Sequence, residues 1–99
     1  MTNSKSYHSF LIESLRDLME ASAYIDAVLE EADPQHIMLA LKNVVEAQRQ
    51  VTGIRDLSWE RVDRILAQSE LPSLVDFAKL LGDLGLRLSV VSEEERLVA

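Results

Sequence analysis

The chain has 99 residues, 47% of them hydrophobic and 27% charged, which suits a single soluble globular domain. It contains no cysteine, so disulfides, thiolate metal sites and a cysteine nucleophile are excluded. Aromatic residues make up only 5%, so aliphatic side chains must fill the core, and that mixture favours an all-α fold.

The N-terminal stretch MTNSKSYHSF lacks the apolar centre of a signal peptide, and no apolar run is long enough to span a bilayer. We therefore expect a cytoplasmic protein without a membrane segment. Its formal net charge of −7 argues against nucleic acid as a partner, because binding to phosphates depends on Lys and Arg.

The charge is unevenly distributed along the chain. Residues 42–64 have a small excess of basic side chains, whereas the segments on both sides are acidic. The basic residues of this segment are Lys42, Arg49, Arg55, Arg61 and Arg64. It is the one part of the sequence whose charge permits a surface that faces DNA.

From Tyr7 onward, apolar residues recur at the three- and four-residue spacing of an amphipathic helix. The first run comprises Phe10, Leu11, Leu15 and Leu18, and the second comprises Ala21, Tyr24, Ile25, Val28, Leu29 and Ala32. We place a break near residues 19–22. No glycine or proline marks it, so two helices and one bent helix both remain open.

The next helix is predicted to begin at Pro34, because Asp33 can cap it and proline suits the first helical position. It runs to about Gln50, with Gly53 as the expected left-handed cap. Its inward residues are predicted to be Ile37, Leu41, Val44, Val45 and Ala47.

A fourth helix is predicted to start after Ser58 as N-cap and to stop at Pro72, with Val62, Ile65 and Leu66 facing the core. Ser73 then caps a fifth helix that ends at Gly85. The inward residues of this last helix are predicted to be Phe77, Ala78, Leu81 and Leu84.

The sequence LRLSVV after Gly85 alternates apolar and polar residues, which is the period of a half-buried strand. A lone strand leaves backbone groups unpaired, so this one should pair with a twin from another subunit or with a partner protein. We expect residues 91–99 to form an acidic, loose tail. We therefore treat residues 1–99 as one domain, globular over about residues 7–90.

Residues capable of catalysis or metal binding form no recognisable pattern. His8 and His36 are far apart, the three glycines form no phosphate-binding loop, and no serine stands in a nucleophile motif. We expect no enzyme, no metal site and no cofactor.

The stretch LSWERVDRIL admits two interpretations. It can be the second helix of a helix-turn-helix, whose first residues reach the bases of DNA. The residue types by themselves favour the other interpretation, a solvated helix face with Trp59 partly tucked against the preceding helix, since Glu60 and Asp63 repel phosphate.

Taken in order, LIESLRDLMEASAYIDAVLEEADPQHIMLALKNVVEA, LSWERVDRIL, LPS and LGDLGLRLSV resemble the addiction-module antidote family of HigA-like, Xre-type helix-turn-helix proteins. The resemblance covers residues 11–90 and implies a lambda-repressor-like domain of five or six helices with a short C-terminal strand. It also implies operator DNA, a homodimer and a RelE/ParE-like toxin as partners. The stretch QRQVTGIRD stands where the family has the first helix of the motif, and it is about one helical turn too short for it.

The first hypothesis is therefore a DNA-binding transcriptional regulator or antitoxin. The alternative is a degenerate family member that acts as a protein-interaction or dimerisation module. The residues assigned to DNA are Arg55, Ser58, Trp59, Glu60, Arg61, Arg64 and Gln68.

Overall fold

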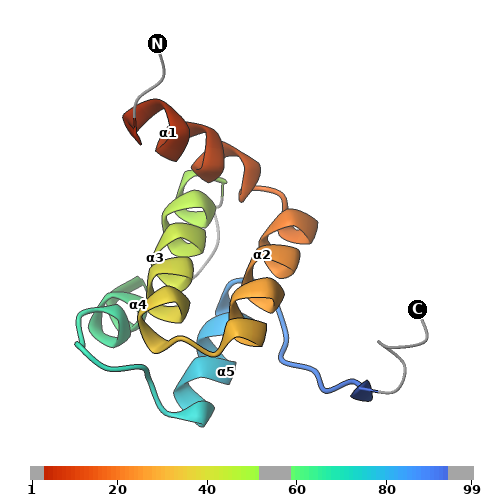
Figure 1. Ribbon diagram of the computed structural model, residues 1–99. Coiled ribbons are helices and arrows are strands. Elements are labelled where there is room, and N and C mark those ends of the chain that lie inside the picture. The colour runs from red at the N-terminus through yellow and green to blue at the C-terminus, as the bar shows by residue number, and fades with distance from the viewer. Residues whose placement is uncertain (1–3, 52–58, 94–99) are drawn as a thin grey trace.

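The computed structural model describes residues 4–51 and 59–93, and it is all-α over these residues. Five helices follow one another: α1 (Ser4–Ser14), α2 (Leu18–Glu31), α3 (Pro34–Val51), α4 (Trp59–Leu66) and α5 (Leu74–Asp83). In Figure 1, α3 occupies the middle, with α2 on one side and α4 on the other, while α1 lies across one end.

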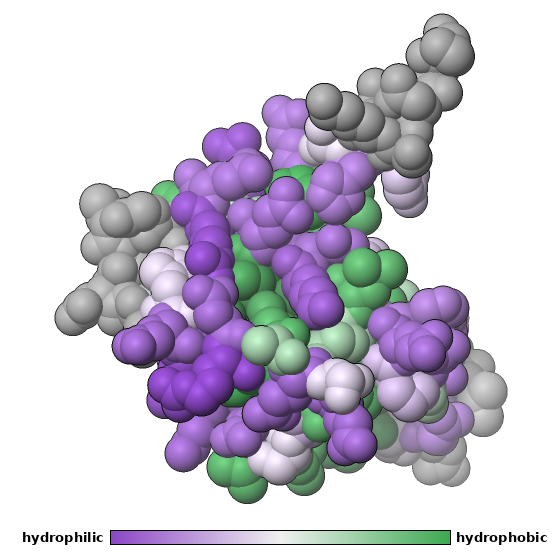
Figure 2. Space-filling view, turned by 90° about the vertical axis from the view of Figure 1, so that its left-hand side faces the viewer, coloured by the Kyte–Doolittle hydropathy of each residue, from purple (hydrophilic) through white to green (hydrophobic). Residues whose placement is uncertain are grey.

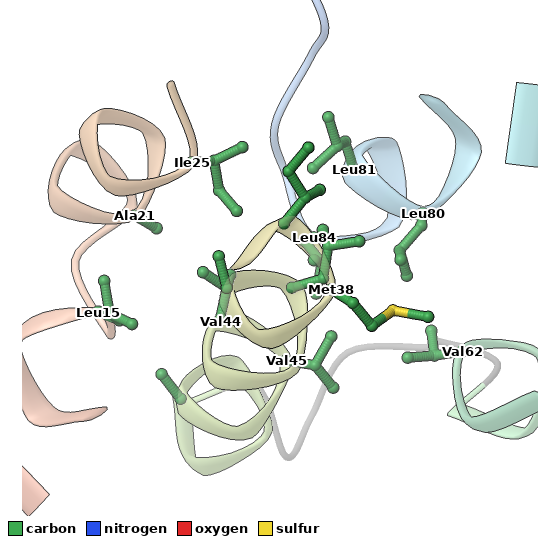
Figure 3. Close-up of a cluster of buried hydrophobic side chains, with 14 of the residues drawn as sticks. Leu15, Ala21, Ile25, Met38, Val44, Val45, Val62, Leu80, Leu81 and Leu84 are labelled. Atoms are coloured by element: carbon green, nitrogen blue, oxygen red, sulfur yellow. The ribbon is translucent and has the colours of Figure 1, made fainter. Parts of the chain in front are cut away.

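Helix α3 is the centre of the hydrophobic core. All five residues predicted to face inward are buried, and Leu41 and Val44 are completely covered. Figure 3 shows side chains from α2, α4 and α5 converging on α3 from different directions. Because α3 is packed on several sides, even its polar Asn43 and Gln48 are buried.

The two buried polar side chains of α3 both have hydrogen-bond partners. The Asn43 amide donates to the Tyr24 hydroxyl at 3.0 Å, which joins α3 to α2. The Gln48 amide donates to the carbonyl of Leu15 at 3.1 Å and to that of Arg16 at 3.3 Å. These bonds satisfy carbonyl groups at the end of α1, where no further helical turn can do so.

The first two helices are separate, and the break lies at residues 15–17, earlier than the predicted residues 19–22. Asp17 is the N-cap of α2, and its carboxylate accepts a hydrogen bond from the Met19 amide at 2.8 Å. The cap residue thus separates the helices without glycine or proline. The prediction placed the break too late because it assigned Leu18 to the first apolar run, whereas Leu18 is the first residue of α2.

The predicted inward face of α1 is partly wrong. Phe10 is 73% exposed, whereas Ile12, which fell outside the predicted stripe, is buried. Of the residues in the apolar run, Leu15 is buried and Leu11 is half-buried against the core. Helix α1 packs on α3, and its exposed Tyr7 and Phe10 show that only part of its apolar surface is covered.

The connection between α2 and α3 has the predicted geometry. Helix α2 ends at Glu31, and its C-cap residue Ala32 adopts the left-handed conformation with φ of 58°. The Asp33 carboxylate then accepts a hydrogen bond from the Gln35 amide at 3.0 Å, and α3 begins at Pro34. Both the cap and the starting residue are confirmed.

Helices α4 and α5 confirm part of the prediction. Helix α4 ends at Leu66, well before Pro72, and a turn connects it to α5. The Ser73 hydroxyl caps α5 as expected, accepting from the Asp76 amide at 3.2 Å. In α5, Ala78 is exposed and Leu80 is fully buried, so one inward position was misassigned.

The predicted C-terminal strand is absent from the described part of the chain. Gly85 takes φ of 87° and turns the chain out of α5, after which residues 86–92 form no regular secondary structure. Leu86 and Leu88 pack against the core, in keeping with the alternation of the sequence. A strand requires a neighbour, and none of the other described segments supplies one.

The described helices include none that is both long and apolar enough to cross a membrane.

Candidate nucleic-acid interface

Helix α4 lies at the edge of the bundle and buries only one face. Val62 and Ile65 are buried and Leu66 is half-buried, which leaves Glu60, Asp63 and Arg64 exposed on the opposite face. Figure 2 views the molecule from the side on which α4 lies, and hydrophilic side chains cover much of this face. The packing of α4 therefore presents a polar surface to solvent.

The charges along α4 follow the helix dipole. Glu60 lies in the first turn and Arg64 in the last, so each is near the helix end that carries the opposite partial charge. Both side chains are exposed, and Arg64 makes no ion pair with any other described residue. Arg64 is thus available to an anionic ligand.

Trp59, which the sequence analysis assigned to DNA, packs partly against the protein itself. Its side chain is half-buried against the hydrophobic core. The Arg49 guanidinium lies 4.6 Å from the centre of the Trp59 ring, which is the geometry of a cation–π contact. Trp59 therefore joins the start of α4 to the end of α3, and only its outer part is open to solvent.

Arg61, also assigned to DNA, is turned toward α5. Its Nη2 donates to Oδ2 of Asp83, the last residue of that helix. The Arg61 side chain remains 41% exposed and that of Asp83 is 21% exposed. The buried Nε of Arg61 has no hydrogen-bond partner among the described residues.

A second ion pair connects α4 to α3. Nη2 of Arg49 donates to Oδ1 of Asp63, with side chains 39% and 60% exposed. Sequence reasoning treated Asp63 only as a charge that repels phosphate and left Arg49 out of the site. The two residues are 14 positions apart on different helices, so no local spacing indicates their contact.

The remaining predicted residues lie outside this surface or outside the described chain. Gln68 is exposed, but it follows the end of α4 and lies in the turn after it, where its amide donates to the Ile65 carbonyl. Arg55 and Ser58 lie outside the described residues, as does the proposed cap Gly53.

The surface around α4 is electrically balanced. Three guanidinium groups belong to Arg49, Arg61 and Arg64, and three carboxylates belong to Glu60, Asp63 and Asp83. Their formal charges sum to zero. The exposed Arg49–Asp63 ion pair contributes only about 0–1 kcal/mol to stability, so Arg49 can exchange its carboxylate for another anion at small cost.

Both histidines lie beside carboxylates, although the sequence indicated no acidic neighbour at ligand spacing. His8 Nε2 is 3.3 Å from Glu46 Oε1. His36 Nδ1 is 3.2 Å from Glu31 Oε1 and 3.7 Å from Asp33 Oδ2. Even so, the described residues contain no group of three or more side chains arranged to hold a metal ion.

Comparison with protein-family models, with curated proteins and with solved structures finds no match to this chain. The resemblance to the antidote family therefore stays a prediction from the sequence.

Proposed function

We propose that the protein is a DNA-binding regulator of the antitoxin type, which contacts duplex DNA through α4 and the arginines around it. The observation that carries this proposal is the gathering of Arg49, Arg61 and Arg64 on and beside one exposed helix. The order of the sequence motifs, which resembles that of helix-turn-helix antidotes, adds to it.

The arginines would bind phosphates and the first turn of α4 would read bases. A guanidinium forms paired hydrogen bonds with phosphate oxygens, and this contact is shorter and stronger than a neutral one. Glu60 lies in the first turn, and a carboxylate in the major groove can accept a hydrogen bond from the cytosine amino group. Arg64 can bind without giving up an existing ion pair, whereas Arg49 and Arg61 must exchange a carboxylate for phosphate.

This charge inventory limits the affinity of one copy. Each phosphate that a basic side chain neutralises contributes about −0.9 to the slope of log affinity against log salt. The three arginines of the described surface around α4 therefore contribute about −3 to this slope in a single domain. A second copy bound to the same duplex would double this contribution.

The test is fluorescence anisotropy of a labelled duplex from the region upstream of the gene, beside a scrambled duplex, at two salt concentrations. Arg64→Ala is expected to weaken binding to both duplexes and to reduce the salt slope by about one. Arg16→Ala is the matched control, because this exposed arginine lies between α1 and α2, away from α4. Equal losses from both substitutions would contradict the proposal.

A second candidate function is a protein-interaction module, and the ion pairs of α4 favour it. Two of the three arginines already have carboxylate partners, and the chain as a whole is acidic. Such a surface suits a basic protein better than a polyanion. The resemblance adds a RelE/ParE-like toxin as the partner to try.

The same titration separates the two functions. If neither duplex binds at either salt concentration, the DNA proposal fails. Co-purification with the product of an adjacent toxin-like gene would then test the second function, and Arg64→Ala should leave that interaction unchanged.

A further inference from the structure

Residues 86–92 leave α5 as an extended segment on the side of the molecule away from α4 (Figure 1). The amide of Leu86 still donates to the Leu81 carbonyl at 2.7 Å. Beyond it, residues 87–91 make no backbone hydrogen bond with any other described segment. Residues 87–91 therefore present backbone donors and acceptors that no other described segment pairs.

The side chains of this segment alternate in exposure. Leu86 and Leu88 pack against the core, while Arg87 and Ser89 are exposed. Val90 breaks the pattern, since its parity is that of the packed residues and yet it is 97% exposed. An extended chain with unpaired backbone groups and an uncovered β-branched side chain is a template for pairing with another strand.

We propose that this segment pairs antiparallel with the same segment of a second copy of the chain, about a two-fold axis at Ser89. In this register, Leu88 of each copy lies opposite Val90 of the other, so both exposed valines are covered. Residues directly opposite in an antiparallel pair have Cβ atoms about 4.5–5.5 Å apart, close enough for these side chains to touch.

Charge also matches in this register. Extending the pairing by one residue beyond the segment, to Glu93, places Arg87 of one copy diagonally across from Glu93 of the other, and diagonal neighbours are within reach of long side chains. The two-fold axis creates this pairing twice. A second copy is therefore complementary to the segment in both apolar contact and charge, which is the requirement of a symmetric interface.

The surface beside the segment would be covered together with it. A groove of about 320 Å³ lies between α2 and residues 86–91, and its apolar wall includes Ile25, Leu29 and Leu88. A two-stranded ribbon is only marginally stable by itself in water, so contacts with such a groove would add to the association.

Sedimentation equilibrium of the full chain without DNA tests the interface independently of any DNA binding. The wild type should convert from monomer to dimer between about 1 and 300 µM, the range expected for a small interface. Val90→Lys should raise the dissociation constant at least tenfold, because two ammonium groups would face apolar Leu88 side chains.

Val75→Lys is the matched control. Val75 is 62% exposed in the first turn of α5, at the end of that helix remote from the segment. The Val75→Lys variant should self-associate as the wild type does. Both Val75→Lys and Val90→Lys should keep the helical circular dichroism of the wild type. A wild type that is monomeric throughout, or equal association of Val90→Lys and the wild type, would overturn the proposal.

A charge exchange tests the register. Arg87→Glu and Glu93→Arg should each weaken self-association, because like charges then meet across the axis. A mixture of the two variants should form a heterodimer, since both diagonal contacts again join opposite charges. Failure of the mixture to associate better than either variant alone would overturn the antiparallel register.

Discussion

Helices α3 and α4 are neighbours with opposite roles in the structure. Helix α3 buries nine of its 18 residues, including two polar side chains, whereas α4 buries two of its eight. The first is fixed by packing on several sides. The second is held by one apolar edge, the exposed Arg49–Asp63 ion pair and the partly buried Arg61–Asp83 ion pair. The difference teaches that α3 supports the fold, whereas the outer face of α4 can serve binding with little effect on stability.

Leu41→Ala tests the dependence of the fold on α3 and should have the largest effect. Leu41 is fully buried, so truncation removes apolar contact and leaves a cavity that costs about 2–5 kcal/mol of unfolding free energy. Leu39→Ala on the same helix is the control, because Leu39 is 55% exposed and its loss should cost much less. Urea denaturation measures both, and similar losses would contradict the assigned core.

Gln48→Leu tests the polar contact between α3 and the end of α1. Two carbonyl groups at the end of α1 would lose their side-chain donor, at a cost of about 1–3 kcal/mol. Gln50→Leu two residues later changes an exposed side chain and should be nearly neutral. If the two variants unfold at the same urea concentration, the Gln48 bonds do not hold α1 in place.

Asp17→Ala tests the capped break between α1 and α2. Removing the N-cap carboxylate should lower the unfolding free energy by about 1 kcal/mol. Asp26→Ala, in the exposed middle of α2, should cost nothing, because alanine has the higher helix propensity. Thermal melts followed by circular dichroism compare the melting temperatures of the two variants. Equal changes in melting temperature would show that the Asp17 cap does not stabilise the protein.

Asp63→Asn should have the smallest effect on stability. It breaks the exposed ion pair with Arg49, which is worth about 0–1 kcal/mol. A loss well above that value in urea denaturation would show that α4 depends on its charges for folding, contrary to the contrast with α3.

The sequence predicted the elements whose signals are local. Pro34 and Asp33 mark the start of α3, Ser73 marks that of α5, and the inward face of α3 follows helical period throughout. These features depend on neighbouring residues alone, so an isolated sequence contains the information.

The features that were missed depend on tertiary contacts. Whether Phe10 or Ile12 faces the core depends on how α1 packs on α3, and the predicted apolar run included Phe10 and left Ile12 out. Helix α4 ends before Pro72, so this proline marked only the last position at which the helix could end. The pairing of Arg61 with Asp83 spans 22 positions and joins two helices, and no spacing rule reveals it.

The most direct test of the DNA proposal compares Asp63→Asn and Arg64→Ala in one anisotropy titration with the upstream duplex. The account predicts opposite shifts: Arg64→Ala weakens binding because it removes a phosphate contact. Asp63→Asn strengthens binding because it removes an anion and releases Arg49. Shifts in the same direction, or no binding by any form of the protein, would contradict the assignment of α4 as the DNA-contacting helix.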